Sequence, residues 1–520
     1  MGAPGTSGRD FFPRERLVCT HTSRYTRAWG WIVLQSFQSR VAVEVSSTSG
    51  AKTPPGPAWR IPLVGETLSF LRDPHRFYLT RIARYGEIFS TSLFGDKCII
   101  VTTPEASKWL LQSAQKFFKP AYPESANSLI DPTRSFGSEQ LHNYVRRIVG
   151  SSLYPESLQS HIPAIEALAC SVLDSWTKQK SVNVYSEMAK YTFEVAMKIL
   201  CGMEPGKQMD ALFQNMQDFE KAFLTLNINL PFTTYRRGLK ARDSMFKAVE
   251  EMIQQRRKKK RDWSGREQQQ RLDMLDSMIC VETKDEKFAN AVTDIHVRGI
   301  IMTILFAGHE TSAAQLVWAI KNLHDNPELL HGVKEEHEAI RRKREPGSPL
   351  TWSQVMKEMP LTLRVINETM RTSYVGLFLP REALDDLEYD GYYFPKGWKV
   401  YASPSMVHLN PKLYTEPYKF DPTRFQDGGP KPNTFIPFGN GQRLCLGGEL
   451  AKVEMLVLIH HLVTTYSWKI KEDHGGIRWW PVPIPKGGLV IQVEREVERG
   501  LEKETRQGQT GELGSGEFQH

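Results

Sequence analysis

The chain has 520 residues, a length that permits several small domains or one large enzyme fold. Hydrophobic residues make up 40% of it, aromatic residues 10% and charged residues 24%, and this usage excludes collagen-like, mucin-like and wholly disordered proteins. The formal net charge of +8, from 67 Lys and Arg against 59 Asp and Glu, suits an acidic partner surface but is too small to indicate nucleic acid.

Residues 1–52 differ in composition from the remainder. They contain seven basic residues, three acidic residues and twelve Ser or Thr, a basic and hydroxyl-rich balance typical of transit peptides. Their most apolar stretch, residues 29–45, is interrupted by Gln35, Gln38, Arg40 and Glu44, so no transmembrane helix is predicted there. We interpret residues 1–52 as an atypical leader, which is either a targeting or anchoring segment or a disordered or misassigned start.

A proline-rich segment at residues 54–57 is expected to lead into the folded domain, which we predict to span residues 53–496. Two apolar stretches, residues 88–94 and 98–101, flank Gly95-Asp96-Lys97 and predict a hairpin. Most of the pattern from there to residue 290 is helical, so the front half is predicted to be rich in helices with a small sheet.

Two polar segments are interpreted as lying outside the core. A run of six basic residues at 256–261 is predicted to be a solvated loop between helices rather than a nucleic-acid patch. Residues 497–520 are rich in Gly, Glu and Gln, with few apolar side chains, and are predicted to be a disordered tail.

The strongest helix prediction covers residues 293–325. Thr293 or Asp294 can cap it, Pro327 follows its end, and apolar residues recur almost all round, which is typical of a central buried helix. Its middle, residues 307–312, contains a glycine and four polar residues, and this interruption indicates a functional site. The alternative is that a Thr hydroxyl bonds to a carbonyl one turn earlier and bends the helix.

Six cysteines stand far apart and form no CxxC pair, which argues against a disulfide scaffold or a zinc ribbon. They are Cys19, Cys98, Cys170, Cys201, Cys280 and Cys445. Cys445 alone lies in a glycine-punctuated loop, residues 438–447, directly before a predicted helix. A helix N-terminus stabilises an anion, so the position favours a thiolate.

This loop, Phe438-Gly439-Asn440-Gly441-Gln442-Arg443-Leu444-Cys445-Leu446-Gly447, resembles the haem-binding loop of cytochromes P450. The resemblance implies that Cys445 is the axial thiolate and metal ligand. It also implies that Phe438, Gly439, Gly447 and Arg443 contact the haem.

Two further segments resemble a structural cluster of the same family. Glu368-Thr369-Met370-Arg371 places a carboxylate and a guanidinium on one helical face, and Pro422-Thr423-Arg424-Phe425 follows downstream. The resemblance implies a buried structural cluster of Glu368, Arg371 and Arg424. By itself an ExxR pattern is most often a surface ion pair.

The interrupted helix carries Ala-Gly-x-Glu-Thr, which resembles the oxygen-activation signature of the family. The resemblance implies that Thr311 hydrogen-bonds dioxygen, that Glu310 relays protons and that Gly308 leaves space beside the iron. His142 and Arg146 resemble the family's residues that bind a haem propionate, and Arg381 stands where a further propionate ligand is expected. Buried propionates require cationic donors because of their desolvation.

The resemblance covers residues from about 54 to 495 and implies the cytochrome P450 fold: mainly α, a triangular helical bundle with a long central helix and small β-sheets near the N-terminal part. It implies haem b, O2 as cosubstrate and insertion of one oxygen atom into a substrate. No GxGxxG or P-loop motif is present, so electrons are expected from NADPH through a separate reductase. Its acidic face is expected to dock on a basic patch that includes Arg443 and Lys452.

Several stretches, such as PLVGETLSFL and KPNTFIPFGNG, resemble the plant terpenoid and sterol hydroxylases, and most of all the abscisic acid 8'-hydroxylases. Departures fall where substrate is expected to bind, and the helix carries Gly308-His309-Glu310 where Ala-Arg-Asp is expected. The expected substrate pocket is mainly apolar. It comprises Tyr122, Leu129, Ile130, Phe136, Leu226, Ile304, Ala307, Val375, Leu377, Phe378, Val482 and Pro483, with Lys119 or Arg134 as the anchor for a carboxylate.

We therefore expect a monooxygenase that hydroxylates a lipophilic isoprenoid, an abscisic acid-like terpenoid acid before a sterol, brassinosteroid, diterpenoid or triterpenoid. Alternatives of another class are a hydroperoxide isomerase or dehydratase and a non-catalytic haem protein. The family resemblance implies the endoplasmic reticulum membrane surface, with the plastid as the alternative. Nucleic acid is not an expected partner.

Overall fold

The computed structural model describes residues 50–57, 65–122, 129, 139–223, 225, 228–261, 273–280 and 293–496. All of these except residue 50 belong to the second of two units, residues 51–520. The predicted tail at 497–520 and nearly all of the predicted leader lie outside the described residues.

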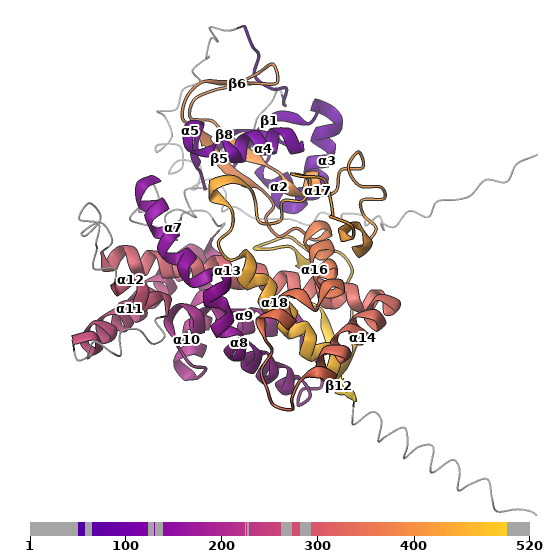
Figure 1. Ribbon diagram of the computed structural model, residues 1–520. Helices are drawn as coiled ribbons and strands as arrows, with labels where there is room; N and C mark the ends of the chain where they lie inside the picture. Colours follow the sequence, from indigo (N-terminus) through magenta and orange to yellow (C-terminus); the bar gives the residue numbers. More distant parts are fainter. Residues whose placement is uncertain are drawn as a thin grey trace, which may run out of the picture. The chain divides into compact units, whose positions relative to one another are not determined.

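Helices make up most of the described structure (Figure 1). Many begin with Pro in the first turn, where the missing N–H costs nothing, and Asp73, Thr103 and Thr351 accept a hydrogen bond from the first-turn backbone. The α-helices are α2 Thr67–Arg72, α3 Pro74–Tyr85, α4 Pro104–Gln112, α5 Ala114–Phe117, α7 Glu139–Leu153, α8 Pro155–Trp176, α9 Val184–Cys201, α10 Lys207–Ala222, α11 Thr234–Arg261, α12 Met274–Cys280, α13 Asp294–Asp325, α14 Pro327–Lys343, α15 Trp352–Lys357, α16 Pro360–Thr372, α17 Pro404–His408 and α18 Gly448–Thr465. The described residues also form the 3-10 helices η3 Pro422–Phe425 and η4 Gly441–Arg443.

The predicted hairpin is confirmed: Ile88 pairs with Val101 in an antiparallel register. Its second strand continues into a five-stranded sheet, in the order β1-β2-β8-β5-β3, in which β2 and β8 are parallel. The strands are β1 Ile88–Leu93, β2 Asp96–Val101, β3 Phe118–Pro120, β4 Val182–Asn183, β5 Leu379–Ala383, β6 Leu387–Tyr389, β7 Tyr392–Phe394, β8 Lys399–Ala402, β9 Tyr466–Glu472, β10 Ile477–Arg478, β11 Ile484–Pro485 and β12 Val490–Arg495.

The small sheets are less confined to the N-terminal part than the sequence indicated. β9 and β12 pair near the C-terminal end of the described chain, and β12 also pairs with β4, which lies about 300 residues earlier. Such long-range pairing leaves no local signal, because the partner strand is fixed by the fold and not by a neighbouring turn.

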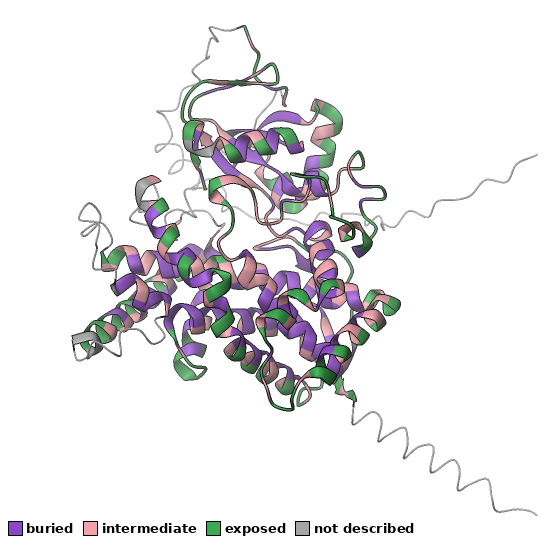
Figure 2. Cartoon of the chain, in the orientation of Figure 1, coloured by how far each residue is buried: buried purple, intermediate pink, exposed green. Residues whose placement is uncertain are grey.

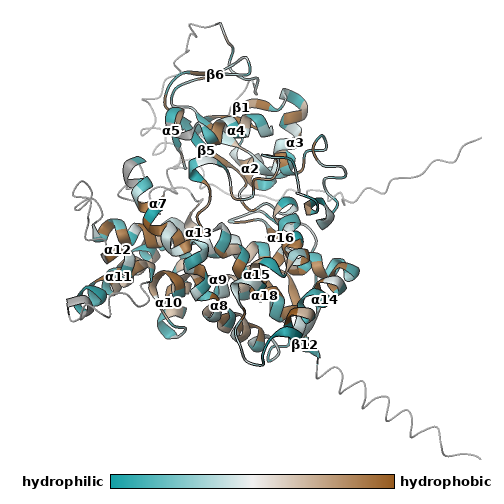
Figure 3. Ribbon diagram, viewed as in Figure 1, coloured by the Kyte–Doolittle hydropathy of each residue, from teal (hydrophilic) through white to brown (hydrophobic). Residues whose placement is uncertain are grey.

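Helix α13 occupies the centre of the helical part, in contact with α9, α11, α14, α16 and α18 (Figure 1). Thr293 is its N-cap residue, as one of the two predicted alternatives. Figure 2 shows many buried positions in the helices around the place that its label has in Figure 1, and Figure 3 shows hydrophobic residues alternating with hydrophilic ones along these helices. Within the described ranges it is the one helix long and apolar enough to cross a membrane, but 67% of its most apolar window is buried, as in a core helix.

One sequence interpretation is wrong. The basic run at 256–261 is the last part of α11 and not a loop. Arg256 contacts Asp273 at 2.7 Å and Asp276 at 2.5 Å beside α12, and cationic residues are favourable at the C-terminal end of a helix. Lys and Arg are also good helix formers, so a run of them does not by itself end a helix.

Candidate active site

The loop before α18 is held in a tight turn that presents Cys445. The backbone N–H of Cys445 donates to the carbonyl of Phe438 at 2.9 Å. Gly439 and Gly441 have φ angles of 78° and 71°, and a Cβ on Gly441 would lie 2.5 Å from the carbonyl oxygen of Leu111 in α4. Only glycine fits there, because the loop is pressed against a neighbouring helix.

The Cys445 thiol is solvent-accessible, unlike the buried thiols of Cys98 and Cys201. Desolvation by the surrounding protein raises its pKa, although the N–H of Gly447 and the charge of Arg146 act in the opposite direction. In the protein alone, desolvation therefore outweighs the helix N-terminus in its effect on the pKa of this thiol. A bound metal cation would supply the missing stabilisation.

Basic side chains gather near this loop. Arg381 in β5 is 7% exposed; its Nη1 donates to the adjacent carbonyl of Pro380, and its Nε has no hydrogen-bond partner. Arg443 lies near enough to Arg381 that their repulsion adds to the burial that lowers the pKa of Arg443. In α7, Arg146 donates to the carbonyl of Leu444 at 2.6 Å, and the Nδ1 of His142 has no hydrogen-bond partner.

This basic cluster fits a bound dianion. Buried cations without an anion are costly, and within the described ranges Glu139 is the carboxylate that acts on Arg443. Space for a flat group is also present: a Cβ built on Gly308 or Gly447 would meet no atom within 4 Å, and Ala307 is exposed in the middle of the buried helix α13. The residues therefore fit a haem with two propionates.

The polar residues in the middle of α13 include both the predicted hydrogen bond from a Thr hydroxyl to the preceding turn and a buried acidic side chain. The Thr311 hydroxyl donates to the carbonyl of Ala307 at 2.7 Å, which is the predicted bond one turn back. Glu310 is buried, and the Tyr185 hydroxyl in α9 donates to its carboxyl group. Burial, reinforced by the charge of Glu220, raises the pKa of Glu310 to about 8.

The Glu368, Arg371 and Arg424 group is brought together. Both Glu368 and Arg371 are fully buried in α16, and the Nε and Nη2 of Arg371 each donate to a Glu368 oxygen at 2.7 Å. The Nε of Arg424 in η3 lies 3.5 Å from the same carboxylate as an ion pair, without hydrogen-bond alignment. Arg371 also donates to the carbonyls of His408 and Pro417, which ties α16 to the loop that follows α17.

Residues 54–478 match the cytochrome P450 family. The chain belongs to the cytochrome P450 family. The family uses a haem iron and dioxygen, with electrons supplied by a reductase, so this chain is a cytochrome P450 monooxygenase.

Three relatives are similar over most of their lengths. Abscisic acid 8'-hydroxylase CYP707A1 of Solanum lycopersicum is 40% identical over 86% of this chain and 92% of its own length. Abscisic acid 8'-hydroxylase 4 of Arabidopsis thaliana is 39% identical over 86% of this chain and 93% of its own length. The solved structure of retinoic acid-bound cyanobacterial CYP120A1 has a TM-score of 0.75 and 28% identity, covering 86% of this chain and 100% of its own.

The residues that the sequence predicted to line the substrate pocket lie in several different parts of the described structure. Leu129 belongs to the main helical core, with Ile304 packed against it, whereas Val375 packs against a small cluster of Ala314 and Val482. Tyr122 and Ala307 are exposed. Ile130, Phe136, Leu226 and Arg134 lie outside the described residues.

Leu377 and Phe378 belong to the aromatic cluster beside the five-stranded sheet. Phe378 stacks on Tyr401 with ring centroids 4.9 Å apart, and the carbonyl of Leu377 accepts a hydrogen bond from Tyr78. Both side chains therefore contribute to packing there. Lys119, expected as a possible carboxylate anchor, forms an ion pair with Glu382 at 2.8 Å, so its charge is already matched.

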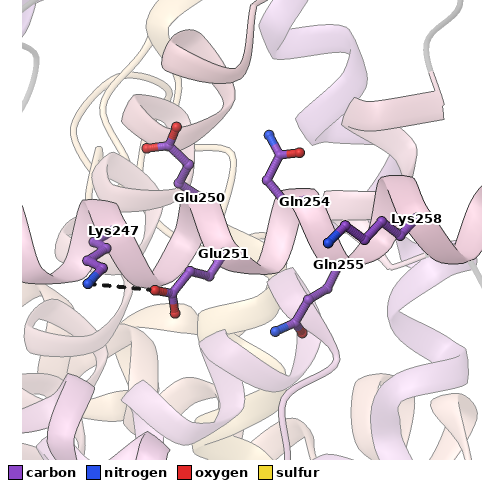
Figure 4. Close-up of a pocket in the computed structure, with 6 residues that line it drawn as sticks. All are labelled: Lys247, Glu250, Glu251, Gln254, Gln255 and Lys258. Carbon is purple, nitrogen blue, oxygen red and sulfur yellow. Dashed lines mark ion pairs between the residues drawn. The ribbon is translucent and has the colours of Figure 1, made fainter.

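A separate surface pocket lies along α11 and is lined by charged and amide side chains (Figure 4). Its residues are Lys247, Glu250, Glu251, Gln254, Gln255 and Lys258. The Lys247–Glu251 ion pair spans 4.0 Å on the exposed face of the helix. An exposed polar lining of this kind does not suit a lipophilic P450 substrate.

Sequence reasoning missed the side chains that surround Glu310. Tyr185, Glu220 and His309 meet it from three helices, α9, α10 and α13. The one signal in the sequence was His309, at a position where another residue type was expected. Which side chain faces Glu310 from a distant helix depends on helix packing and leaves no local pattern.

Proposed function

We propose that this cytochrome P450 hydroxylates abscisic acid at the 8' position with a haem b ligated by Cys445. The observation that carries the proposal is the combination of a solvent-accessible Cys445 with a buried cationic group that has an unpartnered Arg381 Nε. The abscisic acid 8'-hydroxylases named above support the substrate. Retinoic acid in the similar solved structure is likewise an isoprenoid carboxylic acid, which supports the substrate class.

Different side chains would bind the iron and the propionates of the haem. Cys445 would hold the iron, while Arg381, Arg443, Arg146 and His142 would bind and orient the propionates through charge-assisted hydrogen bonds. When bound, the haem supplies the activation of dioxygen, with two electrons originating from NADPH, and the insertion of one oxygen atom into a C–H bond while the other leaves as water.

Proton delivery is assigned to α13. Glu310, which precedes Thr311 in the chain, holds a proton at its buried carboxyl group, and Gly308 leaves room for the reactants because no side chain projects there. Apolar side chains such as Ile304 and Val482 exclude water and favour a lipophilic skeleton positioned by shape.

The electron donor is proposed to be an NADPH-dependent reductase that docks near the Cys445 loop. Lys452 is less available for such docking than expected, since its Nζ lies 2.8 Å from Glu449, and Arg443 is only partly exposed. We further propose the endoplasmic reticulum membrane surface as the location. Microsomal fractionation of the native protein tests this, and recovery in plastids would contradict it.

Replacement of Cys445 by Ala tests the haem assignment. The reduced wild-type protein should bind carbon monoxide with the Soret band of a thiolate ligand, and Cys445→Ala should lose that band completely, because no other thiolate then reaches the iron. Cys98→Ala, which removes a buried thiol away from this loop, is the matched control and should keep the band. A retained band in Cys445→Ala would contradict the assignment.

A binding-spectrum screen tests the substrate. Abscisic acid should shift the haem to high spin and, with a plant reductase, yield an 8'-hydroxylated product. If a neutral sterol produces the shift and abscisic acid does not, the substrate is a sterol instead. Turnover of a fatty-acid hydroperoxide without oxygen or reductase would favour an isomerase or dehydratase.

A further inference from the structure

A buried ionisable cluster lies beside the proposed oxygen-activation residues. It consists of Tyr185 in α9, Glu220 in α10, and His309 and Glu310 in α13. His309 is 0% exposed, Glu220 5% and Glu310 7%. Their carboxylate and ring nitrogen atoms lie within 4.8 Å of one another. Burial of charged groups is costly, so the charges in this cluster must be neutralised by protons or by a bound cation.

The hydrogen bonds of His309 fix its tautomer. Nδ1 lies 2.8 Å from the carbonyl of Leu305, which can only accept, so Nδ1 carries the proton. Burial lowers the pKa of His309, so the ring is neutral and Nε2 is an acceptor. Thr192 in α9 donates to the carbonyl of His309 at 2.8 Å and holds this turn of α13 in place.

The acceptor Nε2 of His309 lies 2.5 Å from Oε1 of Glu220. The two atoms are not aligned for a linear hydrogen bond, and neither has another hydrogen-bond partner among the described residues. Two acceptors at this separation repel each other unless a cation or a proton lies between them. Protonation of Glu220 removes this repulsion, because the carboxylic acid is neutral.

Cations near the cluster are peripheral. The Arg478 guanidinium of β10 lies 4.7 Å from the centroid of the Tyr185 ring and is exposed, and Lys221 is an exposed neighbour of Glu220. From the other side, Glu454 of α18 interacts with Ser312 and adds no positive charge. Burial raises the pKa of Glu220 to about 8, as it does that of Glu310.

A metal ion fits the cluster less well than protons do. Two ligands on one tetrahedral zinc, each about 2.0 Å from the ion, lie roughly 3.3 Å apart. The 2.5 Å separation of His309 and Glu220 is shorter than this, so the two atoms are too close together to be ligands of one zinc ion.

We propose that Glu220, held against His309, is a positioning residue that keeps Glu310 protonated within a hydrogen-bonded chain with Tyr185. The inference rests on the proposed function, since it makes Glu310 the residue that stores a proton for the reaction. In this proposal Glu220 does not contact the substrate or the haem. If Glu220 ionised, its negative charge would lie beside the carboxyl group of Glu310. The repulsion between two negative charges would then oppose the ionisation of Glu310.

Infrared spectroscopy of the resting full-length holoenzyme tests the stored proton without turnover. The wild type should show a protonated carboxyl C=O band at pH 7 that shifts in D2O and is missing in Glu310→Gln. Titration should remove this band near pH 8. Absence at pH 7 of any band sensitive to Glu310→Gln would overturn the proposal. This measurement requires no variant of Glu220 to fold.

Glu220→Gln tests the positioning role. The amide keeps the shape but cannot ionise, so the Glu310 band should titrate roughly one pH unit lower or more. With abscisic acid, the alkaline limb of the product yield against pH should shift equally. Glu454→Gln is the matched control: it replaces another buried acid that packs against α13, and it should leave the Glu310 titration and the alkaline limb in place. An unmoved Glu310 titration in Glu220→Gln overturns the positioning role.

Zinc addition completes the test. One equivalent of Zn²⁺ should leave the unfolding temperature of the wild type unchanged; a rise that is lost in His309→Ala would show a metal site instead and overturn the proposal. Failure of the proposed function is distinguishable, because it appears as a missing thiolate carbon monoxide band or as absent abscisic acid turnover, with the infrared result intact.

Discussion

The Thr311 hydroxyl can act both as a hydrogen-bond donor and as an acceptor. Its proton is donated to the Ala307 carbonyl, which supports the turn of α13 that carries Gly308. The oxygen keeps a free acceptor site, so the same group can still accept a hydrogen bond from a reactant or water. The preceding residue, Glu310, is buried, and its carboxyl group lies against Tyr185 and Glu220.

Thr311→Ala should leave the thiolate carbon monoxide band intact and uncouple turnover. Without the hydroxyl, electrons should be lost to hydrogen peroxide or water, and the product formed per NADPH should fall by about tenfold or more. The measurement is product, NADPH and peroxide in one assay.

Thr311→Ser is the matched control, since it keeps the hydroxyl and the bond to Ala307. It should retain most of the coupling. Equal uncoupling in both variants would mean that the methyl group, and not the hydroxyl, is what matters.

At the scale of elements, α16 is fixed by one charged side chain. The guanidinium group of Arg371 donates hydrogen bonds to Glu368 and to the backbone carbonyls of His408, Pro417 and Lys419. This one residue therefore joins α16 to the segment that follows α17. Every one of these contacts is buried or nearly so. Removal of the carboxylate would leave an uncompensated cation in the interior.

Glu368→Gln should lower the free energy of unfolding by about 3–5 kcal/mol, because Arg371 then remains buried and charged without its counter-ion. Chemical denaturation measures it. Glu338→Gln in α14 is a matched control, since Glu338 and Arg341 form the same i,i+3 pair at 3.1 Å on the surface.

The control should change the free energy by less than about 1 kcal/mol, since exposed pairs contribute little. Equal losses in the two variants would show that Glu368 acts through helix propensity and not through burial of its partner.

At the scale of the whole molecule, a directional chain of hydrogen bonds joins α14, α16 and α18. Thr362 donates to Glu336 at 2.6 Å, so its oxygen accepts from Nε2 of His337 at 2.8 Å. Nδ1 of His337 is therefore an acceptor for Nδ1 of His460, 3.0 Å away. Nη1 of Arg344 lies 3.5 Å from Nε2 of His460, so each ring donates once and accepts once, which is possible only while both are neutral.

Stability should fall as the pH drops below about 6.5. Burial lowers the pKa of His337 to about 3 and of His460 to about 2, so the unfolded chain takes up protons first and is favoured as the pH falls. The slope should reach about 1.4 kcal/mol per pH unit for each proton. His461 acts oppositely: Cys170 and Glu166 raise its pKa to about 9 against the opposing effect of burial, and its contribution is lost as the pH rises towards 9.

Unfolding measured between pH 7 and 5 checks this slope. His337→Asn should flatten it, whereas His331→Asn, an exposed histidine in the same helix, should leave it unchanged. A slope that persists in His337→Asn, with His460 unaltered, would assign the acid sensitivity to other groups.

The sequence predicted local features well. The hairpin at β1 and β2, the length of α13 and the tight loop before α18 all depend on residues close together in the chain, such as Gly95, Thr293 and Gly441. Turn residues, caps and periodicity act over a few residues, so one sequence contains them in full. The helical end of α11 was missed because Arg256 in its basic run pairs with Asp273 and Asp276, which lie 17 and 20 residues further along the chain.

By itself, the sequence determined the family, the all-round apolar helix and the order of the motifs, because each is carried by residue types at short, fixed spacings. Only the tertiary structure decided which groups meet: Tyr185 and Glu220 at Glu310, Arg381 beside Arg443, and His337 against His460. These contacts join helices and strands far apart in the chain. Their charges and pKa values follow from burial and distance, which exist only once the helices have packed.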